Sequence, residues 1–259
     1  VTHAEAADYV RESGHDEWVI EERLVGEEFT VQAFVADGEV RPTLAVQDHK
    51  RAYEGDEGPN TGGMGSYSDV GATLPFMTEA DYDDAVAIIE ATVDALDDYR
   101  GVLYGQFMLT AEGPRVVEFN ARFGDPEAMN TLAVLETPFI DVLTAARDGD
   151  ALPTLDFTGE ATVCKYAVPE GYPTDPEAGA EVTLDESSVG DALLFYASVD
   201  ARADGIYTTT SRSFAVVGRG DTIQAAAALS GLGAGFRVRH DVGKAALVRQ
   251  RVDHMDELR

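Results

Sequence analysis

Residues 47–67 read QDHKRAYEGDEGPNTGGMGSY and join an ionic cluster to a loop that holds four glycines. The cluster comprises Asp48, His49, Lys50 and Arg51, and the glycines are Gly58, Gly62, Gly63 and Gly65. A backbone so rich in glycine can adopt positive φ and approach a ligand closely, with N–H groups free to cradle an oxyanion. The stretch predicts a phosphate-handling loop. The alternative is a surface loop whose glycines only turn the chain.

The 259 residues are enough for a large core and for two domains. Nineteen basic and 48 acidic side chains give a net charge of −29, which argues against binding to nucleic acid or to an anionic membrane. The acids are spread over the whole length. This favours either a surface adapted to high salt or a surface that docks a basic partner. We expect the first, a halophilic protein whose fold weakens at low salt.

No apolar run approaches the roughly 18 residues of a membrane-spanning helix, and no signal peptide is visible, so we expect a cytoplasmic location. The single cysteine, Cys164, lies in the apolar run ATVCKYAV and is expected to be buried rather than catalytic. The chain opens on Val1, and Thr2 is suited to cap a helix that follows directly. We therefore expect it to start within a longer protein.

Hydrophobic spacing predicts mixed helices and strands. The pair Asp37-Gly38 between two strand-like runs predicts a hairpin. Residues 78–99 predict a helix capped by Thr78, with its apolar face running to Leu96. Residues 101–110 and 115–123 predict paired strands, and residues 126–148 a helix interrupted at Pro138. After a change of composition at 147–160, strands are expected at 161–168, 192–199 and 205–218, then a helix around 221–229 and a charged tail.

A polar triad lies in the segment RVVEFNARF, residues 115–123. If the segment is a strand, Glu118, Asn120 and Arg122 share one face and the residues between them share the other. Glu118 and Asn120 offer the oxygen ligands that Mg²⁺ takes beside phosphates and water. Arg122 can hold a transferring phosphoryl group or an oxyanion. The alternative is a polar edge strand with an incidental ion pair.

Two further features each allow two interpretations from the residues alone. Glu21 and Glu28 end a strand-to-loop passage where a carboxylate could accept from ribose hydroxyls, but surface acids are common in so acidic a chain. His49 could be a general base or a hydrogen-bonding surface residue. No spacing of cysteine and histidine suggests a zinc site.

Three segments together resemble the phosphoribosylamine-glycine ligases, also called glycinamide ribonucleotide synthetases, of the ATP-grasp superfamily. They are VIEERLVGEEFTVQAF (19–34), QDHKRAYEGDEGPNTGGMGSYS (47–68) and VVEFNARFGDPE (116–127). The resemblance implies an α+β fold, with a partial ATP-grasp core before a smaller C-terminal mixed α/β domain with an antiparallel sheet. Residues 1–19 would be a remnant of the lid, 20–150 the catalytic subdomain and 151–259 the C-terminal domain. An N-terminal Rossmann-like domain and most of the lid would be missing.

The resemblance implies an ATP-dependent ligase of purine biosynthesis. It would join glycine to 5-phosphoribosylamine through a glycyl phosphate, giving glycinamide ribonucleotide, ADP and phosphate, with Mg²⁺ or Mn²⁺ bound. We expect a monomer that binds no nucleic acid or membrane and that is inactive without the missing N-terminal part. The alternatives are another ATP-grasp carboxylate-amine ligase, and a noncatalytic nucleotide-binding module or half of a split enzyme.

Residue roles follow from the same resemblance. The metal ligands would be Glu118 and Asn120, and the catalytic residues Arg122 and Lys50. ATP would be bound by Glu21, Glu22 and Leu24 at the adenine and by Glu28 at the ribose. The substrate residues would be Asp48, Asn60, Gly62, Gly63 and Met64. Two positions depart from the family pattern: Gln106 stands where relatives carry a second metal carboxylate, and Arg212 follows TTTS instead of a glycine pair.

Overall fold

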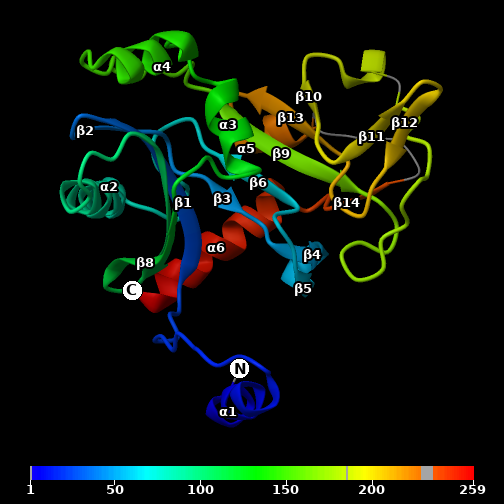
Figure 1. Cartoon of the computed structure of the whole chain (residues 1–259), viewed down its shortest axis with the longest axis horizontal. Helices are drawn as coiled ribbons and strands as arrows, with labels where there is room; N and C mark the ends of the chain where they lie inside the picture. The colour runs from blue at the N-terminus through cyan, green and yellow to red at the C-terminus, as the bar shows by residue number, and fades with distance from the viewer. Residues whose placement is uncertain (1, 185, 229–235) are drawn as a thin grey trace.

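The computed structural model describes residues 2–184, 186–228 and 236–259, and its sheets are antiparallel (Figure 1). The first sheet has the order β2-β1-β7-β8. Its strands are β1 (Glu27–Ala36), β2 (Glu39–Pro42), β7 (Gly101–Thr110) and β8 (Gly113–Asn120). Asp37 and Gly38 take φ of 51° and 79° between β1 and β2, as a tight hairpin turn requires. The predicted hairpin and strand pair are confirmed.

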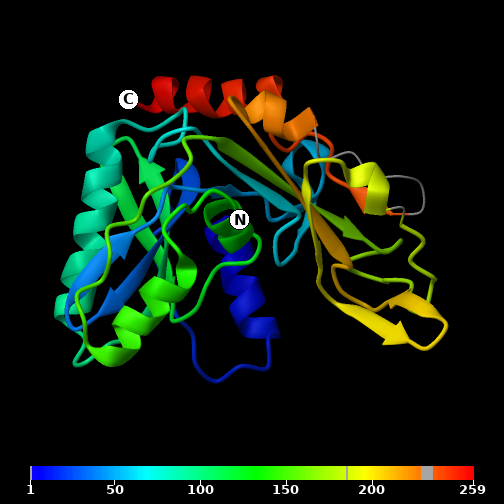
Figure 2. The ribbon, with the colours of Figure 1, turned by 90° about the horizontal axis from the view of Figure 1, so that it is seen from above.

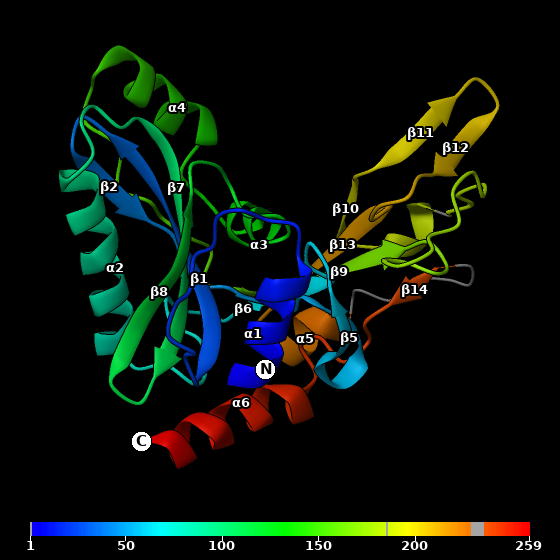
Figure 3. The ribbon, with the colours of Figure 1, turned by 60° about the horizontal axis from the view of Figure 1, so that its bottom comes forward.

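Helix α2 (Glu79–Asp94) covers one face of the first sheet (Figure 3). It begins with a capping box in which Thr78 and Asp81 satisfy each other's backbone N–H groups, so the predicted cap is confirmed. Ile89 and Val93 lie on its buried face. The helix ends before Leu96, which is 42% exposed, so the predicted extension of the apolar face to that residue is wrong.

The second sheet has the order β10-β13-β9-β6-β3, and β14 also pairs with β9. Its strands are β3 (Gln47–Asp48), β6 (Gly65–Ser68), β9 (Ala161–Val168), β10 (Leu193–Tyr196), β13 (Phe214–Gly220) and β14 (Arg237–Val238). Two small hairpins flank it, β4 (Arg51–Tyr53) with β5 (Glu57–Asn60), and β11 (Val199–Arg202) with β12 (Gly205–Thr208). Strands from both sides of residue 150 thus form one sheet, and the division into domains there stays a prediction.

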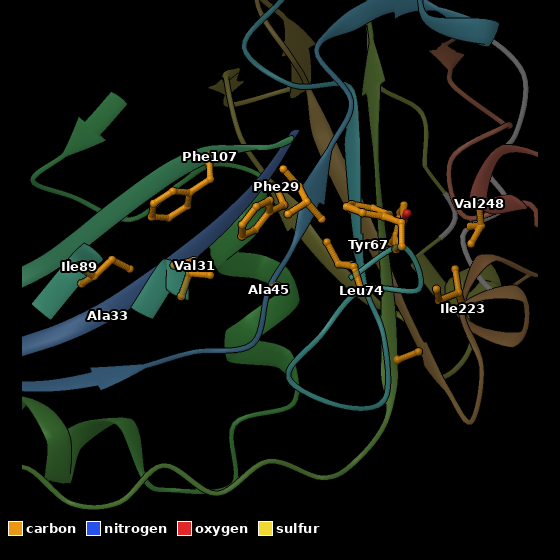
Figure 4. Packing of buried hydrophobic residues seen from close by; sticks show 14 of the residues in the cluster. Phe29, Val31, Ala33, Ala45, Tyr67, Leu74, Ile89, Phe107, Ile223 and Val248 are labelled. Atoms are coloured by element: carbon orange, nitrogen blue, oxygen red, sulfur yellow. The ribbon is translucent and has the colours of Figure 1, made fainter. Parts of the chain in front are cut away.

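One hydrophobic cluster joins the two sheets (Figure 4). Phe29 and Phe107 stack across β1 and β7 with ring centroids 5.3 Å apart. Tyr67 of β6 enters the same cluster, as does Val248 from the C-terminal helix. Burial of these large side chains is the main stabilising contribution that holds the sheets together.

Helices α3 (Glu127–Ala133) and α4 (Phe139–Asp148) replace the single interrupted helix expected over 126–148. The break precedes Pro138, which caps α4, so the predicted interruption is confirmed. Helix α5 (Ile223–Ala228) lies where a helix was expected at 221–229, although residue 229 lies outside the described residues. Cys164 is fully buried, and burial raises the pKa of its thiol.

The C-terminal tail is helical, not simply charged as expected. Helix α6 (Ala245–Leu258) runs along one side of the molecule and buries Leu247, Val248 and Met255 (Figure 2). Its apolar residues are few and lie between charged ones, so the sequence shows no clear helical pattern there. Helix α1 (His3–Glu12) follows the Thr2 cap as predicted, has no buried residue and is set apart from both sheets (Figure 1). No helix in the described ranges is long and apolar enough to cross a bilayer.

An ionic clamp ties the β4–β5 hairpin to the C-terminal segment. The Arg239 side chain is 1% exposed and lies 2.7 Å from Asp56, which also pairs with Arg251 of α6. Asp241 pairs with Arg239 as well and accepts the N–H of Gly55 at 3.0 Å. Burial opposes charge on the Asp56 carboxyl, but Arg251 and Arg239 hold its pKa below the usual range.

Candidate active site

The face of the first sheet opposite α2 carries polar side chains. In register, Thr30 lies opposite Gln106 and Gln106 opposite Glu118, whereas Phe29 and Phe107 point into the core. Gln106 is 3% exposed and donates to Glu28 Oε2 at 2.9 Å. The polar face of three neighbouring strands therefore links Glu28 to Glu118 through Gln106.

The triad predicted from strand alternation does converge. Asn120 Nδ2 donates to Glu118 Oε1 at 2.9 Å, and an Arg122 nitrogen donates to Asn120 Oδ1 at 3.3 Å. The strand ends at Asn120, so Arg122 lies just beyond it. A β-bulge opposite Gln106 and Phe107 breaks the alternation at Val117, which is 39% exposed rather than inward as expected. The roles of the triad stay predictions.

The donor set of this triad fits a hard divalent cation in part. Glu118 and Asn120 supply a carboxylate and an amide oxygen on an accessible surface, which suits an ion that completes its shell with phosphate and water. Within the described ranges no three His, Cys, Asp or Glu side chains form a metal-binding group. Gln106, opposite Glu118, adds no charge. An ion bound by this triad would need further ligands from the phosphates of a nucleotide to stay bound.

Lys50 joins two acids. Its Nζ lies 3.2 Å from Glu28 Oε2 and 3.2 Å from Asp48 Oδ2. Burial alone would lower the pKa of Lys50, but Asp48 and Glu28 together raise it. The Asp48 side chain is 3% exposed, and burial raises its pKa. Its Oδ1 has no hydrogen-bond partner in the described part of the chain.

Glu127 belongs to the same neighbourhood, although no role was predicted for it. It begins α3, is 2% exposed and accepts from Tyr104 Oη at 2.8 Å. Burial, and then the nearby Asp48, raise the pKa of Glu127 to about 7. The signal available in sequence was an acid placed at the start of an apolar helix directly after the polar triad.

Two pockets flank Glu28. The smaller, of about 410 Å³, is lined by Glu21, Glu22, Leu24, Glu28 and Met108, with Arg115, Val116 and Val117 of β8. The structure thus brings together all four residues expected to bind ATP. Residues 17–26 form no strand, in contrast to the strand-to-loop passage that was expected.

The larger pocket, of about 890 Å³, lies between the ionic cluster and α6. Asp48, Lys50 and Asn60 line it together with Arg51 and, from α6, Arg249. Glu28 and Met108 line both pockets, so the two are adjacent. The triad and the residues Gly62, Gly63 and Met64 line neither of these two pockets.

The glycine loop does not offer the free N–H groups that its composition predicted. Thr61 N donates to Lys50 O at 2.8 Å, Gly63 N to Thr61 Oγ1 at 3.0 Å, and Met64 N to His49 O at 2.8 Å. The Met64 side chain is fully buried in an apolar cluster and cannot reach a ligand. The predicted oxyanion cradle is therefore wrong at these positions, because the loop uses its N–H groups to hold itself.

His49 also differs from both expectations. It is 2% exposed, and neither ring nitrogen has a hydrogen-bond partner among the described residues. Burial lowers the pKa of His49 to about 3, so the ring is neutral. An exposed surface role is excluded, although His49 is among the residues that line the larger pocket.

Comparisons with known proteins identify the family of this chain. Two family models match, the phosphoribosylglycinamide synthetase ATP-grasp (A) domain over residues 3–128 and the C domain over residues 162–245. A phosphoribosylamine–glycine ligase of Methanosarcina barkeri is 54% identical over 93% of this chain and 58% of its own length. One from Methanocella arvoryzae is 53% identical over 100% of this chain and 62% of its own length. The chain thus spans about three fifths of these curated relatives.

Solved structures give the same result. The crystal structure of phosphoribosylamine–glycine ligase from Thermotoga maritima matches with a TM-score of 0.73 and 27% identity, over 85% of this chain and 56% of that one. The biotin carboxylase domain of a thermophilic 2-oxoglutarate carboxylase matches with a TM-score of 0.65 and 11% identity, over 96% of this chain and 54% of that one, which supports the fold alone. The chain belongs to the phosphoribosylglycinamide synthetase family, whose ATP-grasp and C domains it carries.

Proposed function

We propose that the polypeptide containing this chain joins glycine to 5-phosphoribosylamine with ATP, giving glycinamide ribonucleotide, ADP and phosphate. The observation that carries the proposal is the convergence of Glu118, Asn120 and Arg122 at the end of β8, a strand that also lines the smaller of two adjacent pockets that share Glu28. Two pockets separated by one carboxylate suit a reaction in which a nucleotide and a second substrate must meet.

The smaller pocket is proposed to hold the adenosine of ATP. Val116 and Val117 give it an apolar wall, while the backbone of residues 21–24 offers polar groups for the base edge. Both contacts of Glu28 to Lys50 and Gln106 use Oε2, which leaves Oε1 for the ribose hydroxyls.

The larger pocket is proposed to hold phosphoribosylamine. Asp48, Lys50 and Asn60 supply polar side chains, and Arg51 and Arg249 supply cations for a phosphate. Side chains replace the backbone N–H groups as the phosphate ligands in this proposal, because the N–H groups of Thr61, Gly63 and Met64 are occupied. Gly62, Gly63 and Met64 then shape the loop rather than contact the substrate.

The chemistry proceeds in two steps. A carboxylate oxygen of glycine attacks the γ-phosphorus of ATP, and ADP leaves. The amine of phosphoribosylamine then attacks the acyl carbon, loses a proton and displaces phosphate. Arg122 is proposed to stabilise negative charge on the transferring phosphoryl group and on the tetrahedral oxyanion. Lys50, held between Glu28 and Asp48, is proposed to orient the reactants where the two pockets meet.

A divalent cation, Mg²⁺ or Mn²⁺, would be held by Glu118 and Asn120, and it would neutralise phosphate charge. Asn120 Oδ1 can turn from Arg122 toward such an ion, since that hydrogen bond is long at 3.3 Å. The monomeric state and the cytoplasmic location expected from the sequence stay predictions.

Kinetics of the complete reading frame test the proposal. Phosphate release is measured in molar salt with glycine, phosphoribosylamine and Mg-ATP, for the wild type, Glu118→Ala and Arg122→Ala. Each variant should lose at least about 10²-fold in turnover. Matched controls are Asp200→Ala and Arg147→Ala, since both side chains are exposed and pair with near neighbours in sequence. Full turnover in both site variants would rule out the assigned chemistry.

A further inference from the structure

Arg212 makes an unusual set of long-range contacts. It lies between β12 and β13, and its side chain is 14% exposed. One terminal nitrogen donates to the carbonyl oxygens of Gly62 at 2.8 Å, Gly63 at 3.1 Å and Asp125 at 3.1 Å. The other donates to Asp125 Oδ2 at 2.9 Å. A single guanidinium therefore bridges two segments that are far from each other and from Arg212 in sequence.

The surroundings fix this guanidinium in place. Its central carbon lies 4.3 Å from the centroid of the Tyr166 ring, and Tyr166 Oη donates to Asp125 Oδ1 at 2.6 Å. Both carboxylate oxygens of Asp125 are thus held from the second sheet. The Arg212 carbonyl accepts from Ser198 N at 2.9 Å, which anchors its backbone. A lysine could supply the charge but not the planar fork of donors or the stacking.

Two glycines of the loop, Gly62 and Gly63, lie against this residue. A Cβ on Gly62 would lie 3.4 Å from the guanidinium carbon of Arg212. A Cβ on Gly63 would lie 2.6 Å from Pro126 Cδ and 3.4 Å from an Arg212 nitrogen. Glycine at both positions lets the two carbonyls turn toward one donor without side chains between them.

The bridged segments lead to the two halves of the proposed site. Asn60, two residues before Gly62, lines the larger pocket. Asp125 lies three residues after Arg122 of the triad. Arg212 is itself in neither pocket lining, so it acts on the site through these loops.

We propose that Arg212 is a positioning residue of the ligase reaction. Its hydrogen bonds hold the glycine loop, whose Asn60 lines the proposed phosphoribosylamine pocket, against the loop that follows Arg122. The amine and the acyl phosphate are thereby held at the distance needed for attack, an alignment in which an error of about 1 Å can cost about 10²-fold in rate. This inference rests on the proposed function.

The kinetic test uses the complete reading frame with Arg212→Ala, Arg212→Lys and the control Arg202→Ala. Arg202 matches Arg212 chemically, since it stacks on Tyr207 at 4.1 Å and pairs with Asp200, but these contacts stay within the β11–β12 hairpin. We expect both Arg212 variants to lose about 10²-fold in kcat/KM for phosphoribosylamine, with the KM for ATP within about twofold of wild type. Added guanidinium ion should partly restore Arg212→Ala.

Three kinetic results would overturn the inference: unchanged kcat/KM in Arg212→Ala, full activity in Arg212→Lys, or an equal rise in KM for ATP and for phosphoribosylamine. Amide hydrogen exchange of the 259-residue chain is a second test that needs no turnover. Exchange at residues 61–65 should be faster in Arg212→Ala than in wild type, while residues 27–36 keep their rates. Unchanged exchange at 61–65 would overturn the inference, whereas a wild type that forms no product would overturn the proposed function alone.

Discussion

Replacing Gly63 by alanine tests the packing of the glycine loop. Gly63 has a φ of 110°, a conformation that L-residues rarely adopt, and its Cβ would lie 2.6 Å from Pro126 Cδ. The backbone strain costs about 1–3 kcal/mol, and relief of the contact by movement of the proline costs about 1–3 kcal/mol more. The lower entropy of the unfolded alanine variant stabilises the fold by about 0.4–1 kcal/mol and offsets part of these costs. The net loss of unfolding free energy should be about 1–5 kcal/mol.

Urea denaturation followed by tryptophan fluorescence and far-UV circular dichroism measures this loss. Gly62→Ala is the adjacent control, because an added Cβ there would lie 3.4 Å from the nearest Arg212 atom, an ordinary van der Waals distance. Gly71→Ala is the distant control, because an added Cβ there has no atom within 4 Å. Both controls should stay within about 1 kcal/mol of wild type. Equal stability of Gly63→Ala and Gly71→Ala would refute the reasoning.

Three further predictions concern charge. Because the folded pKa of Glu127 is raised to about 7, folding takes up protons between about pH 4 and pH 7, and Glu127 destabilises the fold as pH rises. The unfolding free energy of Glu127→Gln should therefore exceed that of wild type by up to about 3 kcal/mol as the pH rises through that range. A difference in urea denaturation that does not change with pH would contradict this. Asp56→Asn should cost about 2–3 kcal/mol at pH 7, since Arg239 and Arg251 each lose one of their charged partners. Because the folded pKa of Asp56 is lowered, the stability difference from wild type should close below about pH 4, and an equal difference at pH 3 would argue against the clamp. The net charge of −29 predicts a thermal midpoint that rises steadily with KCl, whereas a midpoint independent of salt would exclude the halophilic interpretation.

Local features of the fold were predictable because their causes lie within a few residues. Residue type alone determines the backbone preferences behind three of these features: the Asp37-Gly38 turn, the Thr78 cap and the break before Pro138. The triad was predictable for the same reason, since strand alternation brings Glu118 and Asn120 together. The bulge at Val117 was not, because it depends on the pairing with β7.

Features that depend on distant segments could not be predicted. Glu127 became a candidate only when Tyr104 and Asp48 were seen around it. The glycines suggested free N–H groups, but the loop closes on itself and offers carbonyls to Arg212 across about 150 residues of chain. The pairing of β6 with β9 likewise crosses the boundary suggested by composition.

The C-terminal helix could not be predicted for the same reason, because its packing depends on segments that are distant in sequence. Its sequence is rich in charge, and only the position of β1 and β6 shows why Val248 and Met255 are apolar. Arg239 and Arg251 converge on Asp56 from a distant part of the chain. Pairings of this kind depend on the tertiary fold, which no local pattern specifies.

Oxygen transfer from glycine tests the central claim most directly. Glycine labelled with ¹⁸O in its carboxylate is incubated with phosphoribosylamine, Mg-ATP and the protein expressed from the complete reading frame, and the inorganic phosphate is analysed by mass spectrometry. Formation of an acyl phosphate predicts one ¹⁸O in each phosphate released, in step with formation of glycinamide ribonucleotide. Product accompanied by unlabelled phosphate, or ADP formation that does not depend on glycine, would contradict the proposed ligase reaction.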